Sequence, residues 1–172
     1  MKRKVVSAVI VVVCFLLQCT LFNTLALGSV KPNLLIILTS AFGFTRGHKD
    51  GMVIGFFSGL FIDIQFGELL GSYALIYTVI GFINGFFKQI YYDDDVKLPL
   101  FLIAGSELVY GIIIYIFLFM LRGNFQFIHY LGQIIIPELL YTLIVSLGLY
   151  PFLLFVNHKF EAKEKRSASK FV

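Results

Sequence analysis

Hydrophobic residues occur in long uninterrupted runs along this chain. No Lys, Arg, Asp or Glu occurs from Val5 to Val30, from Leu69 to Phe87 or from Leu139 to His158. The hydrocarbon core of a bilayer is about 30 Å thick, and about 20 helical residues cross it at about 1.5 Å each. Runs of this length and polarity therefore predict transmembrane helices.

Polar clusters between the runs divide the chain into six predicted spans. These are Val5–Phe22, Asn33–Thr45, Gly51–Phe66, Tyr73–Phe87, Leu98–Leu121 and Leu131–Asn157. The second and third spans are short, so the alternative is that this pair forms a re-entrant hairpin, which leaves four spans. We favour six spans in a single bundle of residues 1–158, followed by a basic, frayed tail of residues 159–172.

Prolines and polar residues mark the boundaries of these spans. Pro32 suits the first turn of the second span, because the missing N–H of proline is harmless there. The cluster Arg46–Asp50 is expected to form a loop between the second and third spans. Pro137 is expected to kink the sixth span by freeing a carbonyl group.

Lysine and arginine are distributed unevenly over the predicted loops. Of the 14 in the chain, 12 lie on one side of the predicted topology, in residues 2–4, 46–49, 88–97 and 159–170. Lys31 and Arg122 lie on the other side. Because cytoplasmic loops carry the excess of positive charge, both termini are predicted to be cytoplasmic.

The composition excludes several classes of protein. The chain is 59% hydrophobic and 14% charged, whereas soluble proteins carry about 25% charged residues. A chain of 172 residues is too small to bury this much apolar surface away from water. The lipid bilayer is therefore its expected surroundings. A nucleic-acid partner is not expected, because the basic residues are split among short loops.

Glycines four residues apart form the densest pattern in the sequence. Gly51, Gly55 and Gly59 fall on one face of the third span, and Gly81 and Gly85 repeat the spacing in the fourth. Such faces let helix backbones approach closely in lipid. We expect this face to pack the third and fourth spans together. The alternative is that it docks the helix of a partner protein.

Asp63 falls on the same face, four residues after Gly59. A charged residue at the centre of a bilayer costs about 2.5–3.5 kcal/mol on insertion scales. Nearer the interface the cost is smaller. We expect the carboxylate to accept hydrogen bonds from the backbone and hydroxyl around Gly71 and Ser72 and so to close the hairpin, in preference to an ion site.

Two glutamates, Glu107 and Glu138, lie well inside the fifth and sixth spans, and the six spans contain no Lys or Arg to pair with them. Each must therefore be protonated, exposed to a polar cavity, or hydrogen-bonded to a group such as Tyr110, Tyr141 or Asn84. Intramembrane acids are functional candidates by default. Catalysis or transport is nevertheless the less favoured interpretation, because no second motif supports it.

Other motifs that carry chemistry are missing from the sequence. It contains no nucleotide-binding loop, nucleophile motif or cofactor-binding motif, and its three histidines show no metal-ligand spacing. Solvation and capping of the fifth span explain the acidic triplet Asp93–Asp95. We therefore expect neither an enzyme nor a cofactor or metal site.

One stretch of the sequence resembles a known family. Its pattern is Gly51-x-x-x-Gly55-Phe56-x-x-Gly59-Leu60-x-x-Asp63, followed by Gly71-Ser72-x-Ala74-Leu75-x-Tyr77. Together with Pro32-Asn33, the late Pro137 and the chain length, this pattern resembles the MreD family of rod shape-determining membrane proteins.

The resemblance implies a function and a set of partners. It implies a non-enzymatic, multi-pass protein of the bacterial cytoplasmic membrane, within the cell-elongation machinery for peptidoglycan synthesis. The partners it implies are the bitopic protein MreC, the MreB filament, a RodA-type glycosyltransferase and a penicillin-binding transpeptidase.

A more distant similarity provides the alternative function. MreD-like chains look distantly similar to the substrate-binding subunits of energy-coupling-factor transporters, which implies a subunit that binds a vitamin-type molecule, with Glu107 or Glu138 in the pocket. Those subunits typically carry an Ala-x-x-x-Ala docking motif in the first span. This chain contains no such motif, which counts against the transporter function.

Overall fold

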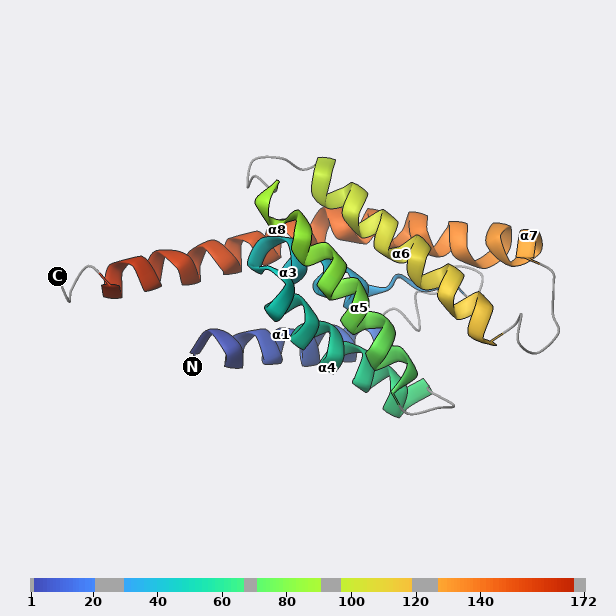
Figure 1. Cartoon of the computed structure of the whole chain (residues 1–172), viewed down its shortest axis with the longest axis horizontal. Helices are drawn as coiled ribbons and strands as arrows, with labels where there is room; N and C mark the ends of the chain where they lie inside the picture. The colour runs from blue at the N-terminus through green and yellow to red at the C-terminus, as the bar shows by residue number, and fades with distance from the viewer. Residues whose placement is uncertain (1, 21–29, 67–70, 91–96, 119–126, 169–172) are drawn as a thin grey trace.

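The computed structural model describes residues 2–20, 30–66, 71–90, 97–118 and 127–168, which form a helical bundle (Figure 1). The helices are α1 (Lys2–Cys19), α3 (Leu34–Arg46), α4 (His48–Phe66), α5 (Ser72–Phe86), α6 (Lys97–Leu118), α7 (Phe127–Tyr130) and α8 (Ile136–Ala168). A 3-10 turn, η1 (Phe87–Gln89), follows α5, and a π-helical segment, η3 (Leu131–Ile135), joins α7 to α8. The helical fold class expected from the sequence is confirmed.

Helix length and polarity identify the parts suited to a bilayer. In the described part of the chain, Lys97–Phe117 and Phe127–Asn157 are helical stretches long and apolar enough to cross a membrane. Val5–Cys19 and Leu34–Arg46 are apolar but shorter. Large apolar side chains such as Phe101 are exposed on the outside of the bundle, where lipid can cover them. These features agree with an integral membrane protein.

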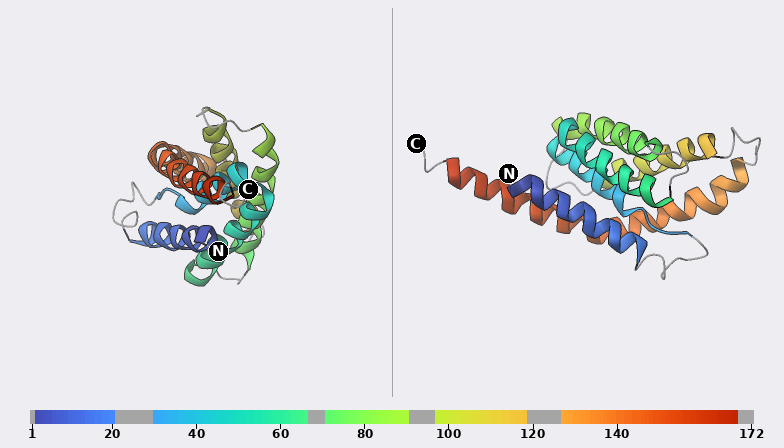
Figure 2. Two further views of the ribbon diagram at one scale, coloured as in Figure 1. Left: turned by 90° about the vertical axis from the view of Figure 1, so that its left-hand side faces the viewer. Right: turned by 90° about the horizontal axis from the view of Figure 1, so that it is seen from below.

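Helix α3 lies at the centre of the bundle. Every residue from Leu34 to Phe44 is buried, and the helix contacts α1, α4, α5, α6 and α8, which lie around it in Figures 1 and 2. Its 13 residues span only about 20 Å. A helix that is apolar on every side is stable where protein or lipid covers all of it, and here protein does so.

The predicted Arg46–Asp50 loop is wrong, because Gly47 alone separates α3 from α4. Gly47 has a φ of +100°, a left-handed conformation that favours glycine. Its N–H still donates to the carbonyl of Gly43 at 2.7 Å. The segment His48–Asp50 forms the first turn of α4, where an acidic residue is favoured by the positive end of the helix dipole. A single glycine is therefore sufficient to separate the two helices.

The last helix is longer than predicted. α8 continues through the basic segment to Ala168, so the expectation of a frayed tail from residue 159 onward is wrong as far as residue 168. This segment is rich in Lys, Glu and Ala, which are strong helix formers. Figure 1 shows it extending beyond the other helices.

A π-helical segment immediately precedes Pro137, where a kink is expected. Proline lacks the N–H that a regular α-helix uses, and its ring disturbs the preceding turn. In η3 the hydrogen-bond pattern shifts by one residue, so the N–H of Ile136 donates to the carbonyl of Leu131. The distortion is therefore a π-helical turn before Pro137, at Leu131–Ile135, that passes directly into α8.

One arginine connects three helices at the end of the bundle where the N-terminus lies. Arg46 donates from Nη1 to Ser7 Oγ at 2.6 Å and from Nε to Asn157 Oδ1 at 3.0 Å. Its guanidinium lies 4.2 Å from the centroid of the Phe42 ring, and its carbonyl accepts from Lys88 Nζ at 2.9 Å. The side chain therefore joins α1, α3 and α8, a structural role beyond the topological one expected for its charge.

Candidate functional site

The glycine face of α4 packs directly on the backbone of α5. A Cβ atom at Gly59 would lie 2.5 Å from the Cα of Ala74, and one at Gly55 would lie 2.7 Å from the carbonyl carbon of Tyr77. Real Cβ atoms essentially never come this close to other atoms. Only glycine therefore permits the observed separation of the two helices.

The same contact continues toward the other end of the hairpin. A Cβ atom at Gly81 would lie 2.5 Å from the carbonyl carbon of Gly51, and one at Gly85 would lie 2.7 Å from the Cβ of His48. Helix α3 covers part of the face too, since a Cβ at Gly51 would lie 2.8 Å from the Cα of Gly43. The glycine face is thus occupied by helices of this chain and is closed to the helix of another protein.

Asp63 caps α5 from the neighbouring helix α4. It is 2% exposed. Its Oδ1 accepts from the N–H of Tyr73 at 3.0 Å and the hydroxyl of Ser72 at 3.4 Å, and its Oδ2 accepts from the N–H of Ala74 at 2.9 Å. The N-cap residue of α5 is Gly71, which has no side chain to do this. The carboxylate therefore satisfies N–H groups at the positive end of α5 and ties the hairpin together.

A buried polar chain starts at Asn33, the N-cap of α3. Its N–H donates to Thr142 Oγ1 of α8 at 3.0 Å. Its Oδ1 accepts from the N–H of Ile36 at 3.3 Å and from the hydroxyl of Tyr77 on α5 at 2.8 Å. The Tyr77 ring lies 5.6 Å from that of Tyr110 on α6. Asn33 thus links α3, α5 and α8. From the sequence, its position before an apolar run indicates only a helix cap.

Glu107 and Glu138 come together at the contact between α6 and α8. A Cβ atom at Gly111 would lie 3.0 Å from Cγ1 of Ile135, so α6 packs on η3 at this point. Helices α6 and α8 run antiparallel (Figure 1). Glu107, one turn before Gly111, therefore faces the turn of α8 that begins near Glu138. In agreement, the charge of Glu138 acts electrostatically on Glu107.

Glu107 is enclosed and lacks the partners expected for it. It is 2% exposed, and neither carboxyl oxygen has a hydrogen-bond partner among the described residues. A bond from Asn84, one of the alternatives that the sequence left open, is not formed. That amide donates instead to the carbonyl of Ile80 at 2.9 Å and to Ser106 Oγ at 2.7 Å. Glu138 is half-buried. A buried acid without a partner is uncommon and requires a physical reason.

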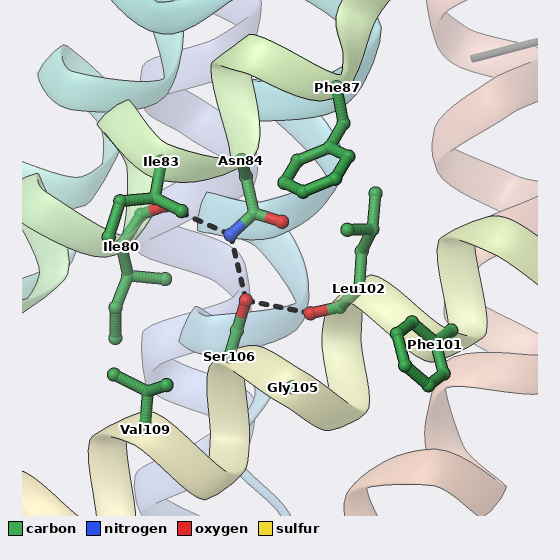
Figure 3. Close-up of a pocket in the computed structure, with 9 residues that line it drawn as sticks. All are labelled: Ile80, Ile83, Asn84, Phe87, Phe101, Leu102, Gly105, Ser106 and Val109. Atoms are coloured by element: carbon green, nitrogen blue, oxygen red, sulfur yellow. Dashed lines mark hydrogen bonds between the residues drawn. The ribbon is translucent and has the colours of Figure 1, made fainter. Parts of the chain in front are cut away.

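Two hollows lie between α5 and α6, and we refer to them together as the α5–α6 groove. The larger has a volume of about 220 Å³ and the smaller about 150 Å³. The larger is lined by Ile80, Ile83, Asn84, Phe87, Phe101, Leu102, Gly105, Ser106 and Val109 (Figure 3). The smaller is lined by Ser72, Tyr73, Leu75, Ile76, Ile114 and Phe117. The groove therefore follows both helices along much of their length.

Asn84 and Ser106 are the polar residues of the larger hollow. The side-chain oxygen of Asn84 takes part in neither of its amide's two bonds, and in Figure 3 it points toward the gap between Phe87 and Leu102. Gly105 borders open space, since a Cβ atom there would meet nothing within 4 Å. The larger hollow thus combines the half-buried Gly105, which has open space beside it, with the buried amide of Asn84, in otherwise apolar surroundings.

The remaining candidate residues do not form a site. The triplet Asp93–Asp95 lies outside the described residues. Within the described ranges, no three His, Cys, Asp or Glu side chains are grouped so that they could hold a metal ion. Cys14 and Cys19 are free thiols.

Comparison with known proteins places this geometry in a family. A search of curated proteins and a search of solved structures found no match to the chain. The family model described as rod shape-determining protein MreD matches residues 2–159. This range includes the glycine face, Asp63, both intramembrane glutamates and the α5–α6 groove. The chain therefore belongs to the MreD family, whose members are membrane proteins with a role in determining rod shape.

Proposed function

We propose that this protein is a non-enzymatic membrane scaffold of the rod-shape machinery that binds the single transmembrane helix of an MreC-like partner. Through that complex it associates with the MreB filament, a RodA-type glycosyltransferase and a penicillin-binding transpeptidase during cell elongation. The family match over residues 2–159 carries the proposal, because the MreD family is part of the MreB and MreC shape-determining system. The enclosed α3 and the backbone contact of α4 with α5 support it, since they make a rigid bundle.

The proposal includes six spans with both termini in the cytoplasm. Lys49 is exposed at the α3–α4 junction, and Ile128 is 85% exposed between α6 and α8. In a variant lacking Cys14 and Cys19, we expect Lys49→Cys to resist an impermeant thiol reagent on intact cells and to react after lysis. Ile128→Cys should react on intact cells. Rapid reaction of Lys49→Cys on intact cells would overturn this topology.

We infer that the partner helix binds in the α5–α6 groove. The glycine face is already covered by α5 and α3. Membrane helices associate through small residues that let backbones approach and through interhelical hydrogen bonds, and the groove offers Gly105 and Asn84 for these two contacts. A lipid chain fills an apolar hollow but cannot donate to the Asn84 oxygen. We therefore propose a helix that carries a hydroxyl or amide side chain.

The test replaces a glycine that faces the groove. Gly105→Leu should fill the groove and leave the fold intact, because its Cβ position meets nothing within 4 Å. Overpacking typically costs about 1–3 kcal/mol, so the affinity for the partner should fall roughly 5- to 150-fold. The measurement is recovery of the partner on co-purification in mild detergent. Gly148→Leu on α8 is the matched control, because that position is equally open.

The outcomes test the binding surface and the scaffold function separately. Loss of the partner from both leucine variants, or from neither, would contradict binding in the groove. Recovery of a stoichiometric single-span protein with the unaltered chain supports the scaffold. A bound vitamin-like molecule or an ATPase-linked partner in its place would support the transporter alternative.

A further inference from the structure

Two acidic side chains inside the bundle, Glu107 and Glu138, take no part in the proposed scaffold. Glu107 lies about 15 Å along α6 from Lys97, close to the middle of a hydrocarbon core about 30 Å thick. Across the α6–α8 contact it faces the turn that carries Glu138. Two carboxyl groups from different helices therefore lie together deep in the membrane.

Tyrosines surround this pair. The described residues place no positively charged side chain beside it. The titratable side chains that interact electrostatically with these glutamates are Tyr77 of α5, Tyr110 of α6 and Tyr130 of α7, and Tyr73 of α5 interacts with these three tyrosines. The hydroxyl of Tyr77 donates to Asn33 instead of to a glutamate. No described Lys or Arg acts electrostatically on Glu107. A negative charge on Glu107 thus has neither a hydrogen-bond donor nor a counter-ion among the described residues.

An ionised Glu107 is incompatible with these surroundings. A carboxylate buried without hydrogen bonds or a counter-ion is so costly that the group takes up a proton instead, and the second acid beside it adds repulsion. A protonated Glu107 gains an O–H donor, for which a carboxyl oxygen of Glu138 is the acceptor across the helix contact. We propose that Glu107 and Glu138 form a proton-binding site, in which Glu107 holds one proton and shares it with Glu138 in a hydrogen bond between α6 and α8.

The proton holds α6 against α8. When it is bound, the pair carries one interhelical hydrogen bond and no more than one negative charge. When it is lost to water, two like charges lie in an interior of low dielectric constant, where their repulsion is strong. Glu138 is the more exposed of the two. A high pH therefore loosens the contact between the two helices.

Chemical labelling of the full-length protein in liposomes tests the site. N,N′-dicyclohexylcarbodiimide is an apolar reagent that modifies protonated carboxyl groups, and mass spectrometry of peptides locates the product. We expect Glu107 to be labelled, the labelling to fall at least tenfold as the pH is raised, and Glu107→Gln to abolish it. Asp63 is the internal control. It is equally buried at 2%, but both of its oxygens accept N–H bonds, so it should remain unlabelled.

Glu138→Gln distinguishes a pair from an isolated acid. Removing the neighbouring negative charge lets Glu107 lose its proton more readily, so labelling should fall at a lower pH than in the unaltered protein. An unchanged pH profile would overturn the pair. Protection of Glu107 by Na⁺ at constant pH would also overturn the proposal, in favour of a metal cation.

Infrared spectroscopy provides a second measurement that does not depend on access of the reagent. The unaltered protein should show the carbonyl stretch of a protonated carboxylic acid, and Glu107→Gln should lose it. Circular dichroism checks that the variant keeps its helices, which is expected because glutamine matches the size of the neutral acid. If the unaltered protein shows no such band at neutral pH, the proposal is wrong.

Discussion

Replacing Gly55 or Gly59 with leucine should prevent the bundle from packing, and this is the largest effect we expect of a single substitution. The first added carbon would lie 2.7 Å from the carbonyl carbon of Tyr77 or 2.5 Å from the Cα of Ala74. A backbone cannot swing aside as the end of a flexible side chain can. Overpacking typically costs about 1–3 kcal/mol, and lipid offers no hydrophobic compensation when helices separate. We expect a loss of about 3 kcal/mol.

Thermal unfolding in mild detergent, followed by circular dichroism, measures this loss. For a chain of this size, about 3 kcal/mol corresponds to a fall in Tm of roughly 6–12 °C. Gly148→Leu is the matched control, because its Cβ position is open and its effect should stay within about 0.5 kcal/mol. A Gly59→Leu protein as stable as the unaltered chain would contradict the α4–α5 contact.

The glycine variants should also differ from the glutamate variants in cells that depend on this protein. Gly55→Leu and Gly59→Leu should lose partner binding and rod-type growth. Glu107→Gln and Glu138→Gln should keep both, because glutamine resembles a neutral glutamic acid in size and hydrogen bonding. If either glutamine variant remains folded and partner-bound but fails to support growth, the scaffold function is wrong, and a proton- or ligand-handling function takes its place.

Replacing Asp63 with alanine should have the second-largest effect. The N–H groups of Tyr73 and Ala74 would lose their acceptor at the buried start of α5. The buried N–H of Ala74, left unsatisfied, costs about 1–3 kcal/mol, the N–H of Tyr73 is only partly buried and costs less, and loss of the negative charge at a helix N-terminus adds about 0.3–1 kcal/mol. We expect a total of about 2 kcal/mol, measured as a fall in Tm of roughly 4–8 °C.

Two further variants separate the cap from its charge. Asp63→Asn keeps one acceptor oxygen, so its stability should lie between those of Asp63→Ala and the unaltered protein. Ser72→Ala removes only the longest of the three bonds, at 3.4 Å, and should have a small effect. If Asp63→Ala unfolds at the same temperature as the unaltered protein, the carboxylate does not hold the hairpin together.

The helices themselves were predictable because each depends on a short stretch of sequence. Apolar runs without charge predict helices, and α6 begins at Lys97 where the span is expected from Leu98. Glycine spacing within one helix also predicts that some backbone approaches it closely. The pattern of hydrophobic and polar residues did not predict where two of the helices begin or end. The left-handed Gly47 shortens the Arg46–Asp50 loop to a single position, and helix-forming residues extend α8 to Ala168.

The sequence by itself therefore determined a helical membrane protein with close glycine contacts and with two glutamates, Glu107 and Glu138, inside apolar spans. Only the tertiary structure decided that α3 is enclosed, that Glu107 faces Glu138, and that a groove lies between α5 and α6. The physical reason is that hydrophobicity and helix periodicity are properties of neighbouring residues. Which faces meet depends instead on packing between segments far apart in the chain, such as Asn33 and Thr142.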